Sequence, residues 1–244
     1  MKQSNVCTVC GARSLAPAGR SSVEPVTDSQ STAAESAQKP TTVILVRHGR
    51  TPTTGQVLPG RAPGLYLSQT GRDQAQHVAD RLAGVPVSAI YTSPMERTRE
   101  TAEPTERATR LTAVVEPDLI ECDFGDWTGR TLTELMKLPE WSAVQRTPSS
   151  FRFPNGESFS HMQARMVDVV ERIQGAHPGG TVVCFSHADP LKALLAHALG
   201  SHLDQFQRIV VDPCSVSVIA YHPGQAPQVL RVNSTEGSLA SLVS

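Results

Sequence analysis

The sequence of 244 residues contains no uninterrupted apolar run of about 18 residues, so it predicts no transmembrane helix. Its first 20 residues also lack the continuous apolar core of a secretory signal peptide. The five cysteines are too few and too scattered for a disulfide scaffold; they are Cys7, Cys10, Cys122, Cys184 and Cys214. These absences favour a reducing cytoplasm as the location of the protein.

The chain also lacks a strong excess of charge and the common metal-binding motifs. Lys and Arg number 22 and Asp and Glu number 23, which excludes a general attraction for nucleic acid or for an anionic membrane. There is no HExxH motif, and Cys7-x-x-Cys10 has no second pair at a useful spacing. We therefore expect no metal, no cofactor, and no nucleic-acid or membrane partner, so any affinity for anions must come from a local cluster.

The composition changes near residue 40. Residues 1–40 are rich in Ser, Thr, Ala and Pro and contain few large apolar residues, so we predict a disordered leader. Residues 41–244 are long enough to form one folded domain with its own core.

Apolar runs and helical patterns alternate from residue 41 onward. We predict strands at 43–46, 88–91, 112–116 and 181–185, and a closing hairpin of strands near 215–221 and 228–232. Helices are predicted from about residue 70, from 94, over 158–176, and from 187 to Gly200. This alternation predicts an α/β fold with three layers: a doubly wound, mostly parallel sheet with helices on both faces.

Two predicted strands end in histidine. Arg47 and His48 follow the first strand, and His187 follows the strand at 181–185, so both histidines should lie at the carboxyl edge of the sheet. Arg97 lies in the first turn of the helix predicted from 94, with Ser93 as its N-cap. Guanidinium groups pair bidentately with phosphate oxygens, and a histidine nitrogen can attack phosphorus. The set suits a doubly charged phosphoryl group.

A leaving alkoxide needs a proton, and the loop at 118–129 offers three carboxylates. Glu121 is the best placed because it lies near the exit of a predicted strand, and Asp123 and Asp126 are its rivals. Arg99 is a rival of Arg97 in the same helical turn.

Four motifs occur in a fixed order: LVRHGRT (45–51), SPMERTRETA (93–102), LIECDFGDWTGRTLTEL (119–135) and FSHADPLKALL (185–195). In this order they resemble the histidine phosphatase superfamily, in its phosphoglycerate mutase-like branch, over about residues 42–232. The resemblance implies that His48 is the phosphorylated nucleophile. It implies a phosphate pocket built from Arg47, Arg97, His187 and the main-chain amide of Ala188. It further implies that Glu121 is the general acid and then activates water.

Two positions depart from the pattern of this family. Arg50 replaces the usual Glu after RHG, and Thr54 replaces the usual Asn. Thr54 keeps a hydroxyl donor for a weaker phosphate contact, whereas Arg50 is either solvated or favours a substrate with a second anionic group.

The loops at 52–67 and 128–157 should line the mouth of the pocket, where Arg61 is expected to give a polar substrate contact. Apolar contacts there are expected from Phe124, Trp127, Trp141, Phe151 and Phe153.

These observations favour a phosphomonoester hydrolase that acts on a small phosphorylated metabolite. A phosphoglycerate mutase is the first alternative, but its substrate carboxylate needs a basic cluster, and the segment at 131–157 offers only Lys137, Arg146 and Arg152. A non-catalytic phosphoester-binding domain is the second alternative. The oligomeric state stays open, and a homodimer is one of the alternatives.

Overall fold

The computed structural model describes residues 39–240. The predicted leader therefore lies outside the described residues except for its last two positions, and the Cys7-x-x-Cys10 motif lies outside them as well. Between residues 39 and 240, no helix combines the length and the apolar character that crossing a membrane requires.

Six strands of the described region form one sheet in the order β3-β2-β4-β1-β5-β6. Their bounds are β1 (Thr41–Arg47), β2 (Val87–Thr92), β3 (Val114–Val115), β4 (Thr181–Ser186), β5 (Val216–Tyr221) and β6 (Gln228–Ser234). The pairs β1–β4, β4–β2 and β2–β3 are parallel, and β5 runs antiparallel to both β1 and β6. The predicted mostly parallel sheet is confirmed.

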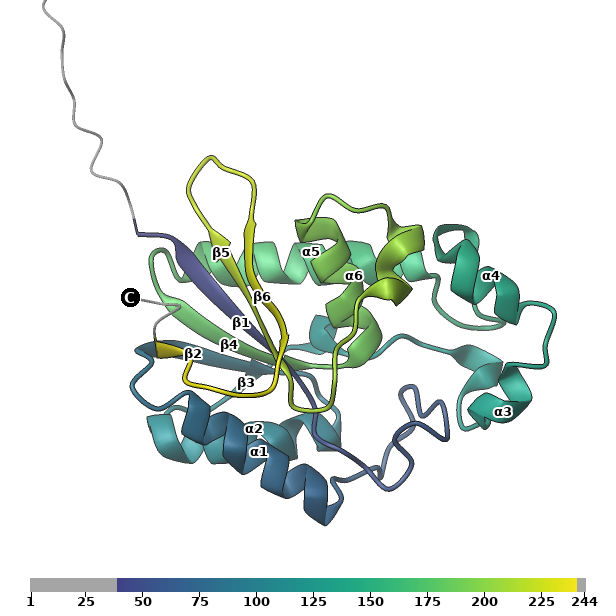
Figure 1. Ribbon diagram of the computed structural model, residues 1–244, viewed down its shortest axis with the longest axis horizontal. Coiled ribbons are helices and arrows are strands. Elements are labelled where there is room, and N and C mark those ends of the chain that lie inside the picture. Colours follow the sequence, from purple (N-terminus) through teal and green to yellow (C-terminus); the bar gives the residue numbers. More distant parts are fainter. Residues whose placement is uncertain (1–38, 241–244) are drawn as a thin grey trace, which may run out of the picture. The chain divides into compact units, whose positions relative to one another are not determined.

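Helices cover both faces of this sheet, as Figure 1 shows. One layer contains α1 (Gln69–Arg81) and α2 (Glu96–Thr109), and the other contains α5 (Phe159–Ala176) and α6 (Ala188–Ala198). Side chains of α5 at the predicted helical spacing are all buried: Phe159, Met162, Met166, Val169, Val170 and Ile173.

The apolar run of β1 explains the three layers. Successive side chains of a strand point to opposite faces of its sheet. Ile44 and Val46 pack in the core with α1 and α2, whereas Val43 and Leu45 pack in the core with α5 and α6. A strand that is buried on both sides must be apolar at every position, which is the pattern that the sequence has.

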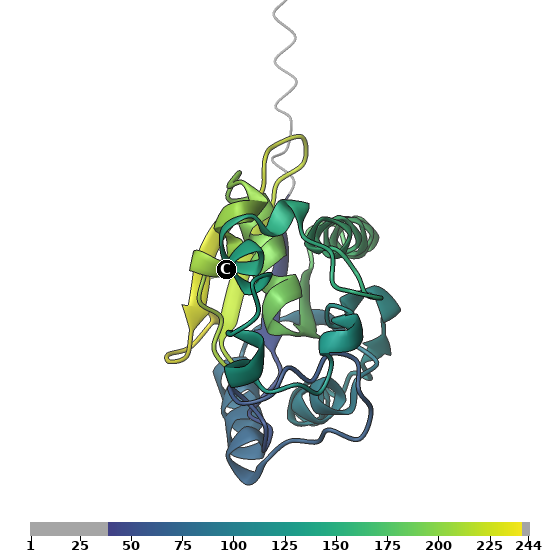
Figure 2. The same cartoon turned by 90° about the vertical axis from the view of Figure 1, so that its right-hand side faces the viewer.

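The segment between β3 and α5 contains only short helices. They are η1 (Pro117–Leu119), η2 (Gly125–Trp127), α3 (Leu132–Leu135), α4 (Trp141–Arg146) and η3 (Pro148–Ser150); a further short helix, η4 (Leu203–Arg208), follows α6. Turned by 90°, the molecule presents α3 and α4 to the viewer (Figure 2).

This segment corrects one prediction. Phe124, Trp127 and Phe153 were expected at the pocket mouth, but each is no more than 3% exposed. Phe124 and Phe153 pack edge to face with ring centroids 5.0 Å apart, and Trp141 and Phe151 pack against the same cluster. A segment that leaves the sheet for about 40 residues has to bury apolar side chains of its own, because the main core lies too far away.

Two element boundaries also differ from the prediction. The helix expected from residue 94 begins at Glu96, because Met95 is its extended N-cap residue, and Ser93 has other partners. The strand expected over 112–116 is reduced to Val114–Val115, since the Ala113 N–H donates to Glu106 Oε1 instead of to a neighbouring strand.

Candidate active site

The two histidines meet because their strands are neighbours. Arg47 lies opposite Ser186 in the parallel register of β1 and β4, so the residues that follow, His48 and His187, leave the sheet side by side. The His48 N–H donates to Ser186 O at 3.0 Å. The imidazole centroids lie 5.3 Å apart, with 59° between the ring planes.

One ring nitrogen of His48 forms a hydrogen bond with the main chain. Nδ1 lies 2.8 Å from Gly49 O, and because a carbonyl can only accept, Nδ1 carries the proton and Nε2 keeps its lone pair. Burial, followed by the charges of Arg97 and Arg47, lowers the pKa of His48 well below its ordinary value. The ring is thus neutral at neutral pH, which is the form that a nucleophile requires.

Glycine is required next to this ring. A Cβ at Gly49 would lie 2.6 Å from the main-chain oxygen of Gly71, at the start of α1. Gly49 N–H also donates to Thr101 Oγ1 at 3.0 Å. The close approach of α1 and α2 therefore fixes the turn that presents His48.

The imidazole of His187 is completely buried, and its Nε2 lies 2.8 Å from Ser93 Oγ. Its Nδ1 is buried and has no hydrogen-bond partner among residues 39–240. Burial and the charge of Arg97 lower the pKa of His187. Ser93 was predicted as a helix cap, and sequence reasoning missed its contact with His187.

The two arginines each use one N–H on the protein and leave others without a partner. Arg97, at 0% exposure, donates from Nη2 to Gly60 O at 2.9 Å, and Arg47 donates from Nη1 to Val211 O at 2.7 Å. Within the described residues, the buried Nε and Nη1 of Arg97 and the buried Nε of Arg47 have no partner. The rival Arg99 is exposed, whereas Arg97 is buried and its charge acts on both His48 and His187.

Glu121 is the buried carboxyl of its loop. It is 6% exposed, and its Oε1 accepts the Cys122 N–H at 2.8 Å. Burial, followed by the charge of Asp189, raises the pKa of Glu121 to about 7, although Arg97 and Arg47 act in the opposite direction. Sequence reasoning did not single out Asp189, which lies in the first turn of α6.

The two rivals of Glu121 lie in wetter surroundings. The Asp123 side chain is 43% exposed, and one of its oxygens accepts the Gly125 N–H. Asp126 is exposed, and its carboxylate accepts from the side-chain amide of Asn155. Neither carboxylate shares the burial that gives Glu121 its altered proton affinity.

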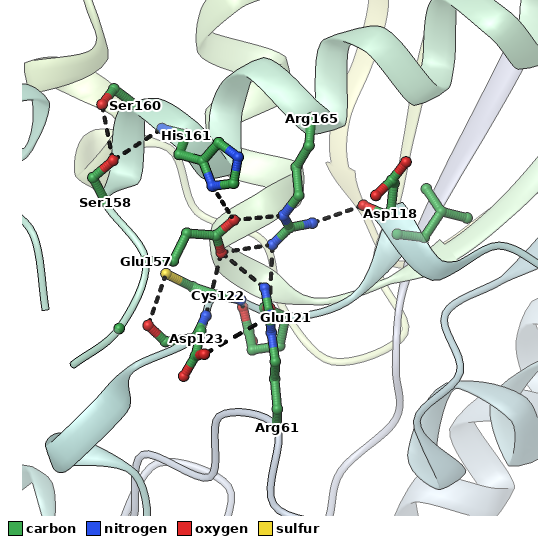
Figure 3. Close-up of polar contacts among 12 residues, drawn as sticks. Arg61, Asp118, Glu121, Cys122, Asp123, Glu157, Ser158, Ser160, His161 and Arg165 are labelled. Atoms are coloured by element: carbon green, nitrogen blue, oxygen red, sulfur yellow. Dashed lines mark hydrogen bonds and ion pairs between the residues drawn. The ribbon is translucent and has the colours of Figure 1, made fainter.

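A polar network surrounds the main chain of Glu121 (Figure 3). Arg61 and Arg165 both donate to the main-chain oxygen of Glu121, and the Glu157 carboxylate pairs with both guanidinium groups. Sequence reasoning missed Glu157 and Arg165. Arg61 was predicted to contact substrate; its N–H groups contact protein atoms here, and the substrate contact stays a prediction.

The remaining predicted residues lie around this centre. Thr54 Oγ1 accepts the Thr51 N–H at 2.8 Å, and its contact with phosphate stays a prediction. The Arg50 side chain is exposed, while its main-chain N–H donates to Gln74. Ala188 is the first residue of α6, where main-chain N–H groups have no partner within the helix.

Comparisons with known proteins cover the whole of this site. The family model described as histidine phosphatase superfamily (branch 1) matches residues 43–235. The bifunctional protein Rv2228c of Mycobacterium tuberculosis is 35% identical over 200 residues, which are 80% of this chain and 54% of that relative. The chain therefore spans about half the length of this curated relative.

A second relative and a solved structure are covered over almost their full length. Phosphoserine phosphatase 1 of Hydrogenobacter thermophilus is 34% identical over 198 residues, which are 79% of this chain and 92% of that protein. The structure of YhfR from Bacillus stearothermophilus superimposes with a TM-score of 0.74 at 29% identity and covers 80% of this chain and 97% of its own.

Proposed function

The chain belongs to the histidine phosphatase superfamily, and on this premise we propose that it hydrolyses small phosphomonoesters through a phosphohistidine intermediate. One observation carries the proposal. Among the described residues, the donors Arg47 Nε and Arg97 Nε and Nη1 are buried without a partner, and so is the ring nitrogen His187 Nδ1. The charges of both arginines act on His48, and the His187 ring lies 5.3 Å from the His48 ring. Buried donors of this kind need acceptors, and a phosphoryl group brings three oxygens.

Charge supports the same ligand. Burial lowers the pKa of both guanidinium groups, but arginine stays protonated near neutral pH. The site therefore holds one fully buried positive charge on Arg97 and one partly buried positive charge on Arg47. A phosphate monoester dianion balances these charges and accepts their hydrogen bonds. The guanidinium groups themselves supply the charge neutralisation that phosphoryl transfer needs.

In the first step, His48 Nε2 attacks phosphorus in line, so a P–N bond forms as the ester P–O bond breaks. The bond between Nδ1–H and Gly49 O holds the ring in the tautomer that leaves Nε2 free. Glu121 transfers its proton to the departing oxygen, which leaves as an alcohol. A pKa near 7 keeps much of this carboxyl protonated at neutral pH.

In the second step, the Glu121 carboxylate accepts a proton from water while the water oxygen attacks phosphorus. The P–N bond breaks, its electron pair returns to His48 Nε2, and inorganic phosphate leaves. Glu121 is protonated again, so the two steps together consume one ester and one water. A carboxyl with a pKa close to the working pH serves both directions of proton transfer.

The test is the release of inorganic phosphate from a panel of monoesters between about pH 5 and 8, in the presence of a chelator. The panel starts with phosphoserine, because one relative is named a phosphoserine phosphatase, and with 4-nitrophenyl phosphate, whose leaving group needs little help from an acid. We expect turnover by the wild type and none by His48→Ala. A wild type that releases no phosphate from any ester overturns the proposal.

Two alternatives give different results in the same assays. A phosphoglycerate mutase interconverts phosphoglycerates faster than it releases phosphate. The three basic residues considered for binding the substrate carboxylate are all exposed: Lys137, Arg146 and Arg152. A binding domain gives tight phosphoester binding, but rapid acid quench with labelled substrate traps no phosphorylated protein. We further propose a reducing cytoplasm as the location. Within residues 39–240, the buried Cys122, Cys184 and Cys214 form no disulfide, which supports this proposal.

A further inference from the structure

Two guanidinium groups meet at one main-chain oxygen next to the candidate acid. Arg61 Nε donates to Glu121 O at 2.8 Å, and Arg165 Nη2 donates to the same oxygen at 3.1 Å. Arg61 reaches it from the loop before α1 and Arg165 from α5, so the two side chains approach from different elements (Figure 3). A main-chain oxygen has two lone pairs, and arginine donors use both of them here.

The carboxylate of Glu157 holds the two arginines together. Its Oε2 accepts from Arg61 Nη2 and from Arg165 Nη2, both at 3.0 Å, and its Oε1 accepts from Arg165 Nε at 2.8 Å. The Glu157 side chain is 5% exposed. Burial opposes its charge, but Arg165 and Arg61 outweigh this effect and hold the pKa of Glu157 below its ordinary value. The three side chains form a clamp on the main chain of Glu121.

The loop that carries Arg61 also contacts Arg97, one of the two arginines of the proposed phosphate pocket. Gly60, the residue before Arg61, accepts the Nη2 hydrogen bond of Arg97 at 2.9 Å. Adjacent residues of one loop therefore contact the buried guanidinium of Arg97 and the main chain of Glu121. Gly60 has a φ of +52°, and a Cβ there would lie 2.9 Å from Thr128 Oγ1, so the loop has little freedom at this point.

We propose that Arg61 is a positioning residue, which sets the Glu121 carboxyl relative to the phosphate site through the Glu121 main chain. This inference rests on the proposed function, because it needs Glu121 to act as the acid. Arg165 and Glu157 are the fixed part of the clamp, whereas the Arg61 side chain is 33% exposed and comes from a loop that also contacts Arg97. The role differs from the substrate contact that the sequence predicts for Arg61.

A positioning role has a kinetic signature. If Arg61 holds the acid in place, its loss slows phosphoryl transfer to His48 most where the leaving group depends on protonation, and it leaves the half-saturating ester concentration nearly unchanged. This first step is measured in a single turnover, because the second step hydrolyses the same phosphohistidine whichever ester was used. Phenyl phosphate and 4-nitrophenyl phosphate are a matched pair for this purpose, because they differ mainly in how much the leaving oxygen needs a proton. A displacement of 1 Å in a catalytic group can cost about 10²-fold in rate, so a partial loosening should be measurable.

The experiment compares Arg61→Met and Arg61→Lys with a matched control, Arg72→Met. Arg72 donates to Leu67 O at 2.9 Å, so its substitution loosens the other end of the same loop without touching Glu121. We expect Arg61→Met to lower the single-turnover rate of phosphoryl transfer roughly tenfold on phenyl phosphate and less than about threefold on 4-nitrophenyl phosphate, with the half-saturating concentration within about twofold. Arg61→Lys should recover part of the loss, and Arg72→Met should behave as the wild type.

Each other outcome has a separate meaning. An equal loss of the single-turnover rate on both esters shows a general structural role and overturns the inference. A raised half-saturating concentration with an unchanged single-turnover rate shows that Arg61 contacts substrate, which also overturns it. Failure of the proposed function is distinguishable, because the wild type itself then releases no phosphate from either ester. Thermal unfolding followed by circular dichroism checks that every variant is folded.

Discussion

Replacing Glu121 by glutamine tests how burial changes the proton affinity of this carboxyl. In the folded protein its pKa is raised from 4.5 to about 7, mainly because burial disfavours the charged form. The folded state therefore binds more protons than the unfolded state between these two values. The stabilisation that follows is fully present below pH 4.5 and is lost as the pH rises through about 7.

The size of the effect follows from the two pKa values. A change of about two and a half decades in proton affinity corresponds to roughly 3 kcal/mol of free energy of unfolding. Most of this loss falls between about pH 5 and pH 9. Glutamine has the shape of the protonated acid but does not titrate, so a Glu121→Gln variant should gain this amount relative to the wild type as the pH rises.

Urea unfolding followed by tryptophan fluorescence at a series of pH values measures this difference directly. The buried histidines titrate in both proteins, so their contribution cancels when the variant is compared with the wild type at each pH. Glu140→Gln is the matched control, because the Glu140 side chain is exposed to solvent in the folded protein as it is in the unfolded chain. A free-energy difference between wild type and Glu121→Gln that stays constant from about pH 5 to 9 would refute the reasoning.

Three further predictions concern individual contacts. Ser93→Ala removes the hydrogen-bond partner of His187 Nε2. It should lower kcat/KM on an aryl phosphate roughly fivefold, because one hydrogen bond contributes about 1 kcal/mol. An unchanged kcat/KM contradicts the role given to Ser93. Gly60→Ala places a side chain on a residue with a φ of +52°, so it should lower the free energy of unfolding by about 1–2 kcal/mol in urea titrations. Activity should also fall, because Gly60 O accepts a hydrogen bond from Arg97. A variant with wild-type stability and wild-type rate contradicts this prediction. Phe153→Ala should lower the free energy of unfolding by about 3–5 kcal/mol, because the ring is 2% exposed and lies in the core. A loss below about 1 kcal/mol would instead fit the pocket-mouth position that the sequence predicts.

Where a local pattern determines the structure, the sequence predicted it well. The apolar run of β1 and the spacing of buried residues along α5 follow from the periods of strands and helices. The meeting of His48 and His187 follows from a rule about parallel sheets, since the carboxyl ends of neighbouring strands share an edge.

Contacts between distant segments could not be predicted in the same way. A serine before a proline at the end of a strand suits an N-cap as well as a partner for His187, and only the neighbouring position of β2 and β4 decides between them. Glu157 lies in an irregular segment without a repeating pattern, and Arg165 lies in the helix that follows it. Glu121, whose main chain Arg165 contacts, lies more than 30 positions earlier than either residue. The aromatic residues of this segment carried no sign of which face they occupy, because short 3₁₀ turns lack a clear apolar period.

The pairing of β1 with β4 and β5 has a consequence for the order in which the protein acquires its site. Thr42 pairs with Thr181, so the first strand of the sheet to leave the ribosome waits for a partner that is made about 140 residues later. Until residues beyond His187 have emerged, His48 has no second imidazole beside it and no complete anion pocket. A nascent chain therefore lacks the proposed anion pocket until then, and a product that stops before β4 is left with an apolar strand and no neighbour to cover it.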